Sequence, residues 1–150
     1  MNVSIIIINY KSGALVMDCI QSIVQQTAAG SYEIIVVDND SQDGAKEKIL
    51  NAYPEVRWLA LDYNAGFARA NNAGMKIAKG DYYLILNADT VILEKAIDKS
   101  IALLKNYPGA VGCGIQLLNG CINHYNQLQI VCIDNGLHKK YCAANQARQL

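Results

Sequence analysis

Polar side chains gather immediately after four apolar runs of this 150-residue chain, at residues 9–12, 38–43, 62–64 and 87–90. Carboxylates, amides and hydroxyls supply oxygen ligands to hard cations and hydrogen-bond partners to nucleotides. In any single loop, the same residue types serve equally well as turns and helix caps. Four such loops at one edge of a sheet would favour a binding site.

Asp89 is the strongest single candidate, because it lies just beyond the apolar run 82–86. A carboxylate in that position loses hydration unless it meets a cation or several hydrogen-bond donors. Mg²⁺ or Mn²⁺ needs few protein ligands when a diphosphate supplies the others. Asp89 beside Asn87 would therefore suffice for a metal–nucleotide pair. The alternative is that Asp89 or Thr90 caps the helix that follows.

Three further features suit a nucleotide. The carboxylate of Asp38 can accept the imino N–H of a pyrimidine base, against which Tyr10 can pack. The segment 64–67 opens a helix with glycine, so free backbone N–H groups there could face an anion. Arg69 is the nearby cation, and Phe67 is expected in the core on helical spacing.

The elements that must position these residues alternate along the chain. Apolar runs predict strands, and apolar stripes at helical spacing predict helices. Strands are expected at 3–8, 33–37, 56–61, 81–86 and 110–118, and helices at 12–24, 45–52, 67–78 and 93–104, with Ser12 as the first helix cap. This order predicts an α/β fold, with a mainly parallel sheet and helices on both faces. Ligands then bind beyond the carboxyl ends of the strands.

Composition excludes several classes of protein. Thirteen basic and thirteen acidic residues give zero net charge, which argues against nucleic-acid binding and electrostatic membrane binding. No apolar run is long enough to cross a bilayer, and we expect no signal peptide, because the strand-like run begins at Val3 without a charged lead-in. Five cysteines, an odd number, are then expected as reduced thiols in a cytoplasmic protein, peripheral to a membrane at most.

Four motifs together resemble family 2 glycosyltransferases, which have the GT-A fold, and most closely their rhamnosyltransferase-like branch. They are VSIIIINYKS (3–12), IIVVDNDSQDG (34–44), NAGFARANNAG (64–74) and GDYYLILNADT (80–90). The resemblance covers residues 1–118, interpreted as one GT-A-like (Rossmann-like) nucleotide-sugar-binding domain. Residues 119–150 are expected to be an incomplete or irregular extension of that domain, with a strand at 129–133.

The resemblance implies a UDP- or dTDP-sugar donor and an inverting transfer to a hydroxyl of a saccharide or lipid-linked acceptor, in surface polysaccharide synthesis. It also implies a divalent cation, Mg²⁺ or Mn²⁺, held by Asp89, with Asn87 in place of the first carboxylate of the family's metal motif. The residues expected at the nucleotide are Asn9, Tyr10, Asp38, Asn39, Asn64, Gly66, Arg69 and Asn87.

One departure from the family concerns the catalytic base. An inverting transfer needs a base for the acceptor hydroxyl, and family members carry it in a later part of the chain, often as a Glu-Asp pair near aromatic residues. Asp134 is the only carboxylate after residue 119, so the catalytic residue stays unassigned. The alternative is a non-catalytic module of the same fold, which binds a nucleotide or hides an exposed apolar face in a homodimer.

Other sites are weaker matches. The segment 112–114 lacks the third glycine of a dinucleotide fingerprint, and no Gly-Lys-Ser/Thr of a P-loop occurs. A receiver domain needs acidic residues after the first strand and a lysine after the fifth, and both are missing here. Zinc-like spacing joins Cys121 to His124 and His138 to Cys142, without the usual turn signals around them.

Overall fold

The computed structural model describes residues 3–28, 30–107, 109–114, 117–118, 124–125 and 131–134. The elements in chain order are β1 (Val3–Asn9), α1 (Gly13–Gln26), β2 (Tyr32–Asp38), α2 (Ala45–Ala52), β3 (Arg57–Ala60), α3 (Phe67–Ile77), β4 (Tyr82–Leu86), α4 (Ala96–Asn106), β5 (Gly112–Gly114), β6 (Leu117–Leu118), β7 (His124–Tyr125) and β8 (Val131–Asp134). Among the residues described, no helix is both long and apolar enough to cross a membrane.

A six-stranded sheet in the order β3-β2-β1-β4-β8-β5 forms the centre of the fold. The first four strands in this order are parallel to one another, and β8 is antiparallel to both β4 and β5. The structure therefore confirms the mainly parallel α/β sheet. It also places a strand, β8, within the region 129–133 and one residue beyond it.

The expected fifth strand at 110–118 is wrong in extent and in position. It is divided into β5 and β6, and β6 pairs with β7 in a separate two-stranded sheet. β5 reaches the main sheet only through β8, which lies between it and β4. The insertion of β8 between β4 and β5 depends on pairing between segments that are far apart in the sequence. The local pattern of apolar residues gives no information on such pairing.

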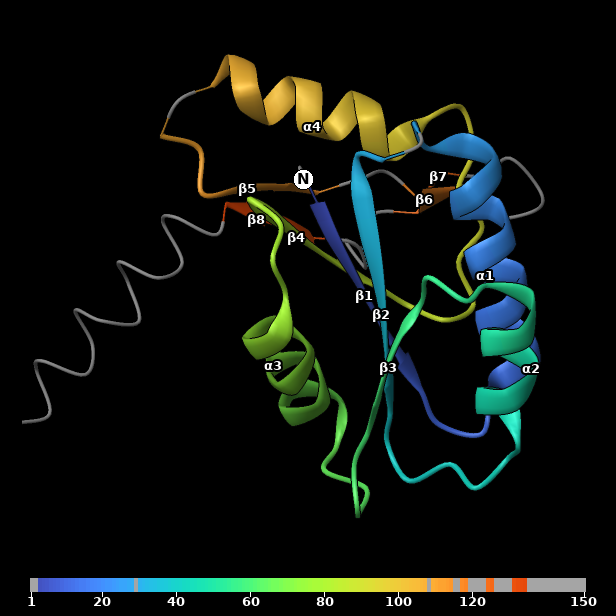
Figure 1. The fold of residues 1–150 in the computed structure, drawn as a ribbon. Helices are drawn as coiled ribbons and strands as arrows, with labels where there is room; N and C mark the ends of the chain where they lie inside the picture. Colours follow the sequence, from blue (N-terminus) through green and yellow to red (C-terminus); the bar gives the residue numbers. More distant parts are fainter. Residues whose placement is uncertain are drawn as a thin grey trace, which may run out of the picture.

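Helices cover both faces of the sheet, as predicted (Figure 1). Alternate residues of β1 separate the two cores: Ile5 and Ile7 pack on the side of α1, α2 and α4, whereas Ile6 packs on the side of α3. This alternation is what a strand buried on both faces requires. The two cores therefore lie on opposite faces of the sheet.

Two helices begin differently from expectation. Ser12 is the residue before α1, but its side chain caps no helix N–H group; its hydroxyl donates to Asn9 Oδ1 instead, at 3.2 Å. The helix expected from residue 93 begins three residues later, because α4 begins at Ala96. Glu94 and Lys95 have φ values of 50° and 56°, which a right-handed helix cannot contain, and Leu93 is left 55% exposed.

The contact of α3 with the sheet depends on Gly74. A Cβ atom there would lie 2.6 Å from Cγ2 of Ile6 and 3.0 Å from Cγ2 of Val37. Both side chains are β-branched and fully buried, so they have little room to turn away. We expect Gly74→Ala to lower the free energy of unfolding by ~1–2 kcal/mol, because overpacking outweighs the gain in helix propensity.

Urea denaturation of Gly74→Ala measures this effect. Asn72→Ala, at an exposed position of the same helix, is the matched control, and its stability should stay within about 0.5 kcal/mol of the parent chain. A Gly74→Ala variant as stable as the parent would show that α3 is not held closely against the sheet.

Candidate functional site

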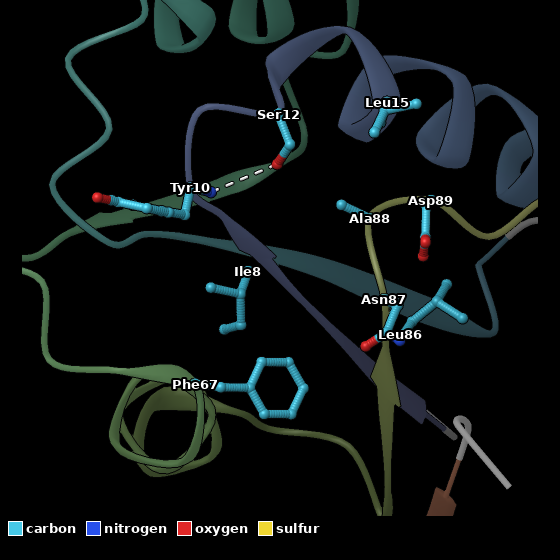
Figure 2. A pocket seen from close by; sticks show the side chains of 9 residues that line it. All are labelled: Ile8, Tyr10, Ser12, Leu15, Phe67, Leu86, Asn87, Ala88 and Asp89. Carbon is cyan, nitrogen blue, oxygen red and sulfur yellow. Dashed lines mark hydrogen bonds between the residues drawn. The ribbon is translucent and has the colours of Figure 1, made fainter. Parts of the chain in front are cut away.

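A pocket of about 320 Å³ opens at the carboxyl edge of the sheet, where β1 and β4 end. Its nine lining residues come from β1 and the loop after it, α1, α3, β4 and the loop after β4 (Figure 2). They are Ile8, Tyr10, Ser12, Leu15, Phe67, Leu86, Asn87, Ala88 and Asp89. The pocket therefore lies at the edge where the rule for open α/β sheets predicts a ligand site.

The pocket wall contains three of the predicted site residues: Tyr10, Asn87 and Asp89. The loops after β2 and β3 do not line the pocket, so the four polar loops share an edge without forming a single crevice. The remaining predicted residues lie outside the wall: at the ends of β1 and β2, in the loops after β2 and β3, or on α3. They are Asn9, Asp38, Asn39, Asn64, Gly66 and Arg69.

Asp89 is an exposed carboxylate at the pocket, across from Tyr10 and Phe67 in the view of Figure 2. Within the described part of the chain, no three carboxylate, His or Cys side chains converge as a metal cage would require. The donors present are instead one carboxylate and the Asn87 amide. Such a pair fits Mg²⁺ or Mn²⁺ only when a diphosphate completes the coordination.

Cys19 lies beneath this part of the pocket, with its thiol 3.9 Å from the backbone oxygen of Asn87. Burial, and after it the negative charge of Asp89, raises the pKa of the Cys19 thiol to about 12. The thiol therefore stays protonated at neutral pH. It does not compete with oxygen ligands for a metal ion, because only a thiolate is an effective ligand.

Two aromatic rings border the pocket. Tyr10 is 46% exposed, and its ring lies 5.5 Å from the Lys11 ammonium nitrogen. The expectation that Phe67 belongs to the core is wrong, because its side chain is 57% exposed. Phe67 is the first residue of α3, so its ring lies over the pocket rather than over the sheet. Both rings offer apolar faces to a ligand.

The loop before α3 is held by two amides. Asn39 Nδ2 donates to Asn64 Oδ1 at 2.8 Å, and Asn39 is nearly fully buried. The backbone N–H of Ala65 donates to Asn39 Oδ1 at 2.8 Å, and that of Gly66 to Asn64 Oδ1 at 3.0 Å. The prediction of free N–H groups facing an anion is therefore wrong for these two residues, since their own side-chain partners satisfy them.

Asn9 and Asp38 are neighbours across β1 and β2. Asn9 is completely buried, and its Nδ2 donates to Asp38 Oδ1 at 3.0 Å. Asp38 is half-buried at the end of β2. Arg69 is exposed on α3. Asp43 belongs to the polar run 38–43 but was not among the predicted site residues, and its place in that run was the only signal for it. It accepts hydrogen bonds from Asn9 and from the N-termini of two helices.

Among the described residues of the C-terminal region, none lines the pocket. Asp134 pairs in register with Tyr82, the first residue of β4, and so lies at the opposite edge of the sheet from Asp89. That position rules it out as a base at the pocket. Cys121, His138 and Cys142 of the zinc-like pattern lie outside the described residues.

Comparison with known proteins decides the family. The model of glycosyl transferase family 2 matches residues 4–148, almost the whole chain. The chain belongs to glycosyltransferase family 2. The family match extends past residue 118, where the motif resemblance ends.

Two curated glycosyltransferases are similar to part of the chain. The glycosyltransferase GlyG of Streptococcus pneumoniae is 33% identical over 100 residues, which is 64% of this chain and 33% of the relative. The UDP-Glc:α-D-GlcNAc-diphosphoundecaprenol β-1,3-glucosyltransferase WfgD of Escherichia coli is 31% identical over 106 residues, 69% of this chain and 42% of the relative. The chain thus spans well under half the length of these curated relatives.

A solved structure supports the GT-A fold. The mannosyltransferase PcManGT of Pyrobaculum calidifontis, in complex with GDP-Man and Mn²⁺, superposes with a TM-score of 0.74 at 18% identity. The match covers 93% of this chain and 46% of the mannosyltransferase. At this identity the likeness establishes the shared fold of this family 2 chain.

Proposed function

We propose that the chain is the donor-binding domain of an inverting glycosyltransferase of the rhamnosyltransferase-like branch. The donor is a UDP- or dTDP-sugar, and the acceptor is a hydroxyl of a saccharide or lipid-linked intermediate in surface polysaccharide synthesis. The observation that carries this proposal is the position of Asp89 beside Asn87, in a pocket at the end of β4 that Tyr10 and Phe67 border. The relative WfgD, by its name, uses UDP-Glc and a lipid-linked acceptor.

The metal is best held by Asp89, with the Asn87 amide beside it. A bound Mg²⁺ or Mn²⁺ supplies charge stabilisation to the leaving nucleoside diphosphate. Asp89 is the one carboxylate among the lining residues, so it sets both the place and the charge of the metal site. The structure of PcManGT, which shares this fold, holds Mn²⁺ together with GDP-Man, and this supports the use of a divalent cation here.

The nucleoside is expected between the loops after β1 and β2. Tyr10 packs against the base, and the Asp38 carboxylate accepts the imino N–H that uracil and thymine share. Arg69 approaches the diphosphate from α3. Asn39, Asn64 and Gly66 act by fixing the loop before α3, because their polar groups bond one another.

A calorimetric titration of the full chain tests this function. UDP, dTDP and GDP are compared, each with and without Mn²⁺. We expect UDP or dTDP to bind only with Mn²⁺, and GDP to bind at least ~10-fold more weakly, because the two-ring guanine is larger than the pyrimidine that Tyr10 and Asp38 are proposed to hold. Absence of binding by all three nucleotides would overturn the proposal.

A non-catalytic, oligomerising role is the second candidate. It is favoured by three large apolar side chains exposed from α4 to the start of β5: Leu103, Tyr107 and Val111. A homodimer could cover them. Solution mass measured at high protein concentration distinguishes this candidate, since a monomer there would eliminate it.

A further inference from the structure

Asn9 uses its whole side chain inside the protein. Its Nδ2 donates to Asp38 Oδ1 at 3.0 Å and to the two Asp43 oxygens at 3.3 and 3.2 Å. Its Oδ1 accepts from the backbone N–H and the hydroxyl of Ser12, at 3.3 and 3.2 Å. With 0% exposure and both ends occupied, the amide is not available to a ligand. It links Ser12, which lines the pocket, to Asp38 and Asp43, which lie outside the pocket wall.

Asp43 fixes one side of this link. Its carboxylate accepts the backbone N–H of Gly13 at 3.2 Å and that of Ala45 at 3.1 Å, which are the first residues of α1 and α2. Helix N-termini stabilise a negative charge. The two helices meet closely at this point, since a Cβ on Gly13 would lie 2.6 Å from Ala45 Cβ. Asp43 is therefore held in place independently of Asp38.

Asp38 has one carboxylate oxygen, Oδ2, that Asn9 does not occupy. Asn9 occupies its Oδ1, and its Oδ2 makes no hydrogen bond to another described residue. An amide has two donor hydrogens; one is directed to Asp43 and the other to Asp38. Rotation of the amide is opposed by Ser12 at the other end. This arrangement restricts the orientation in which Asp38 presents its free oxygen.

We propose that Asn9 is a positioning residue, anchored by Asp43, that orients the Asp38 carboxylate for the imino N–H of the nucleobase. This inference rests on the proposed function. Asn9 thus acts on base selectivity through Asp38 and not by contact with the nucleotide. An uncharged donor is needed between Asp38 and Asp43, because a third carboxylate at position 9 would add like-charge repulsion.

The test is the ratio of UDP to CDP affinity, measured by calorimetry with Mn²⁺ on the full chain. Cytosine has an acceptor at N3 where uracil has a donor, so a positioned Asp38 favours UDP. We expect Asn9→Ala to weaken UDP binding about tenfold, the equivalent of one hydrogen bond to a charged group, and to leave CDP binding nearly unchanged. Asp43→Asn should also lower the ratio of UDP to CDP affinity, because one amide oxygen cannot accept hydrogen bonds from Asn9 and from two helix N–H groups at once.

The control is Ser4→Ala, which removes a buried hydroxyl at the opposite edge of the sheet. It should lower thermal stability and leave the ratio unchanged. Equal losses of UDP and CDP affinity in folded Asn9→Ala would overturn the positioning role; if Asn9→Ala does not fold, an unchanged ratio in Asp43→Asn would do so. If the parent chain binds UDP no better than CDP, Asp38 does not select the base and the positioning role of Asn9 is overturned. If the parent chain binds neither nucleotide, the proposed function itself is refuted.

Discussion

Substitution of Asp89 by alanine is expected to remove Mn²⁺-dependent nucleotide binding, with a loss of UDP affinity of ~100-fold or more. Substituting a residue that only supports a metal ligand typically lowers metal affinity or activity about 10–100-fold. Asp89 is proposed as a ligand itself and is the one carboxylate in the pocket wall, so its loss should cost at least as much. The side chain is exposed, so the variant should fold as the parent chain does. Calorimetric titration with UDP, with and without Mn²⁺, measures the effect.

The matched control for Asp89 is Asp81→Asn. Asp81 is also exposed, but it precedes β4 and so lies at the far edge of the sheet. Its substitution should leave UDP affinity within about twofold of the parent value. Unchanged Mn²⁺ dependence in Asp89→Ala would contradict the metal assignment.

The largest expected effect on stability comes from Glu33. Its carboxylate accepts from the Ser4 hydroxyl, from the backbone N–H of Lys79 at 2.6 Å and from Arg57 at 2.7 Å. Glu33 is 9% exposed, so Glu33→Leu leaves buried donors without an acceptor. We expect the free energy of unfolding to fall by ~3 kcal/mol and Tm by about 10 °C. The loss of free energy is at the lower end of the range for a broken buried ion pair, because Arg57 is partly exposed.

A pH series checks the same carboxylate. Burial raises the pKa of Glu33, but hydrogen bonds from Ser4, Lys79 and Arg57, together with the Arg57 charge, outweigh it and hold the pKa below its ordinary value. A pKa that is lower in the folded state than in the unfolded state means that ionised Glu33 stabilises the fold. This contribution to the free energy of unfolding is present above about pH 4.3, the pKa in the unfolded chain, and is lost as the pH falls through the lower pKa of the folded state. Glu33→Gln should lack this pH-dependent part.

Urea denaturation at pH 7 and below pH 4 tests both expectations. The stability difference between the parent chain and Glu33→Gln should narrow at the lower pH. Glu94→Gln is the control, because its ion pair with Lys99 is exposed on both sides and contributes at most about 0.5 kcal/mol. A difference that is equal at the two pH values would show that the charge of Glu33 does not stabilise the fold.

The elements of the fold could be predicted where burial is local. The run at residues 3–8 is apolar and β-branched, and the structure buries β1 on both faces as that pattern predicts. The insertion of β8 between β4 and β5 could not be predicted, because strand order depends on contacts between distant segments. Phe67 was misplaced because helical spacing does not tell where a helix extends past the edge of its sheet.

The candidate site divides in a similar way. Asp89, Asn87 and Tyr10 line one pocket, because residues just beyond parallel strands share one edge; their part in ligand binding stays a prediction. Asn9, Asn39 and Asn64 could not be distinguished in advance as internal hydrogen-bond partners. An amide has the same donors and acceptor whether it meets a ligand or the protein, so residue type alone does not separate the two uses.

We infer that a divalent cation and a nucleotide bind together at the end of β4. Nuclear magnetic resonance of the ¹⁵N-labelled chain, titrated with Mn²⁺ and UDP, tests it most directly, since Mn²⁺ broadens the signals of nearby amides. We expect broadening centred on Ala88 and Asp89 and extending to Tyr10, with Mg²⁺ and UDP as the diamagnetic reference. Broadening centred at the opposite edge, around Glu33 and Lys79, or none beyond that of free Mn²⁺, would contradict the claim.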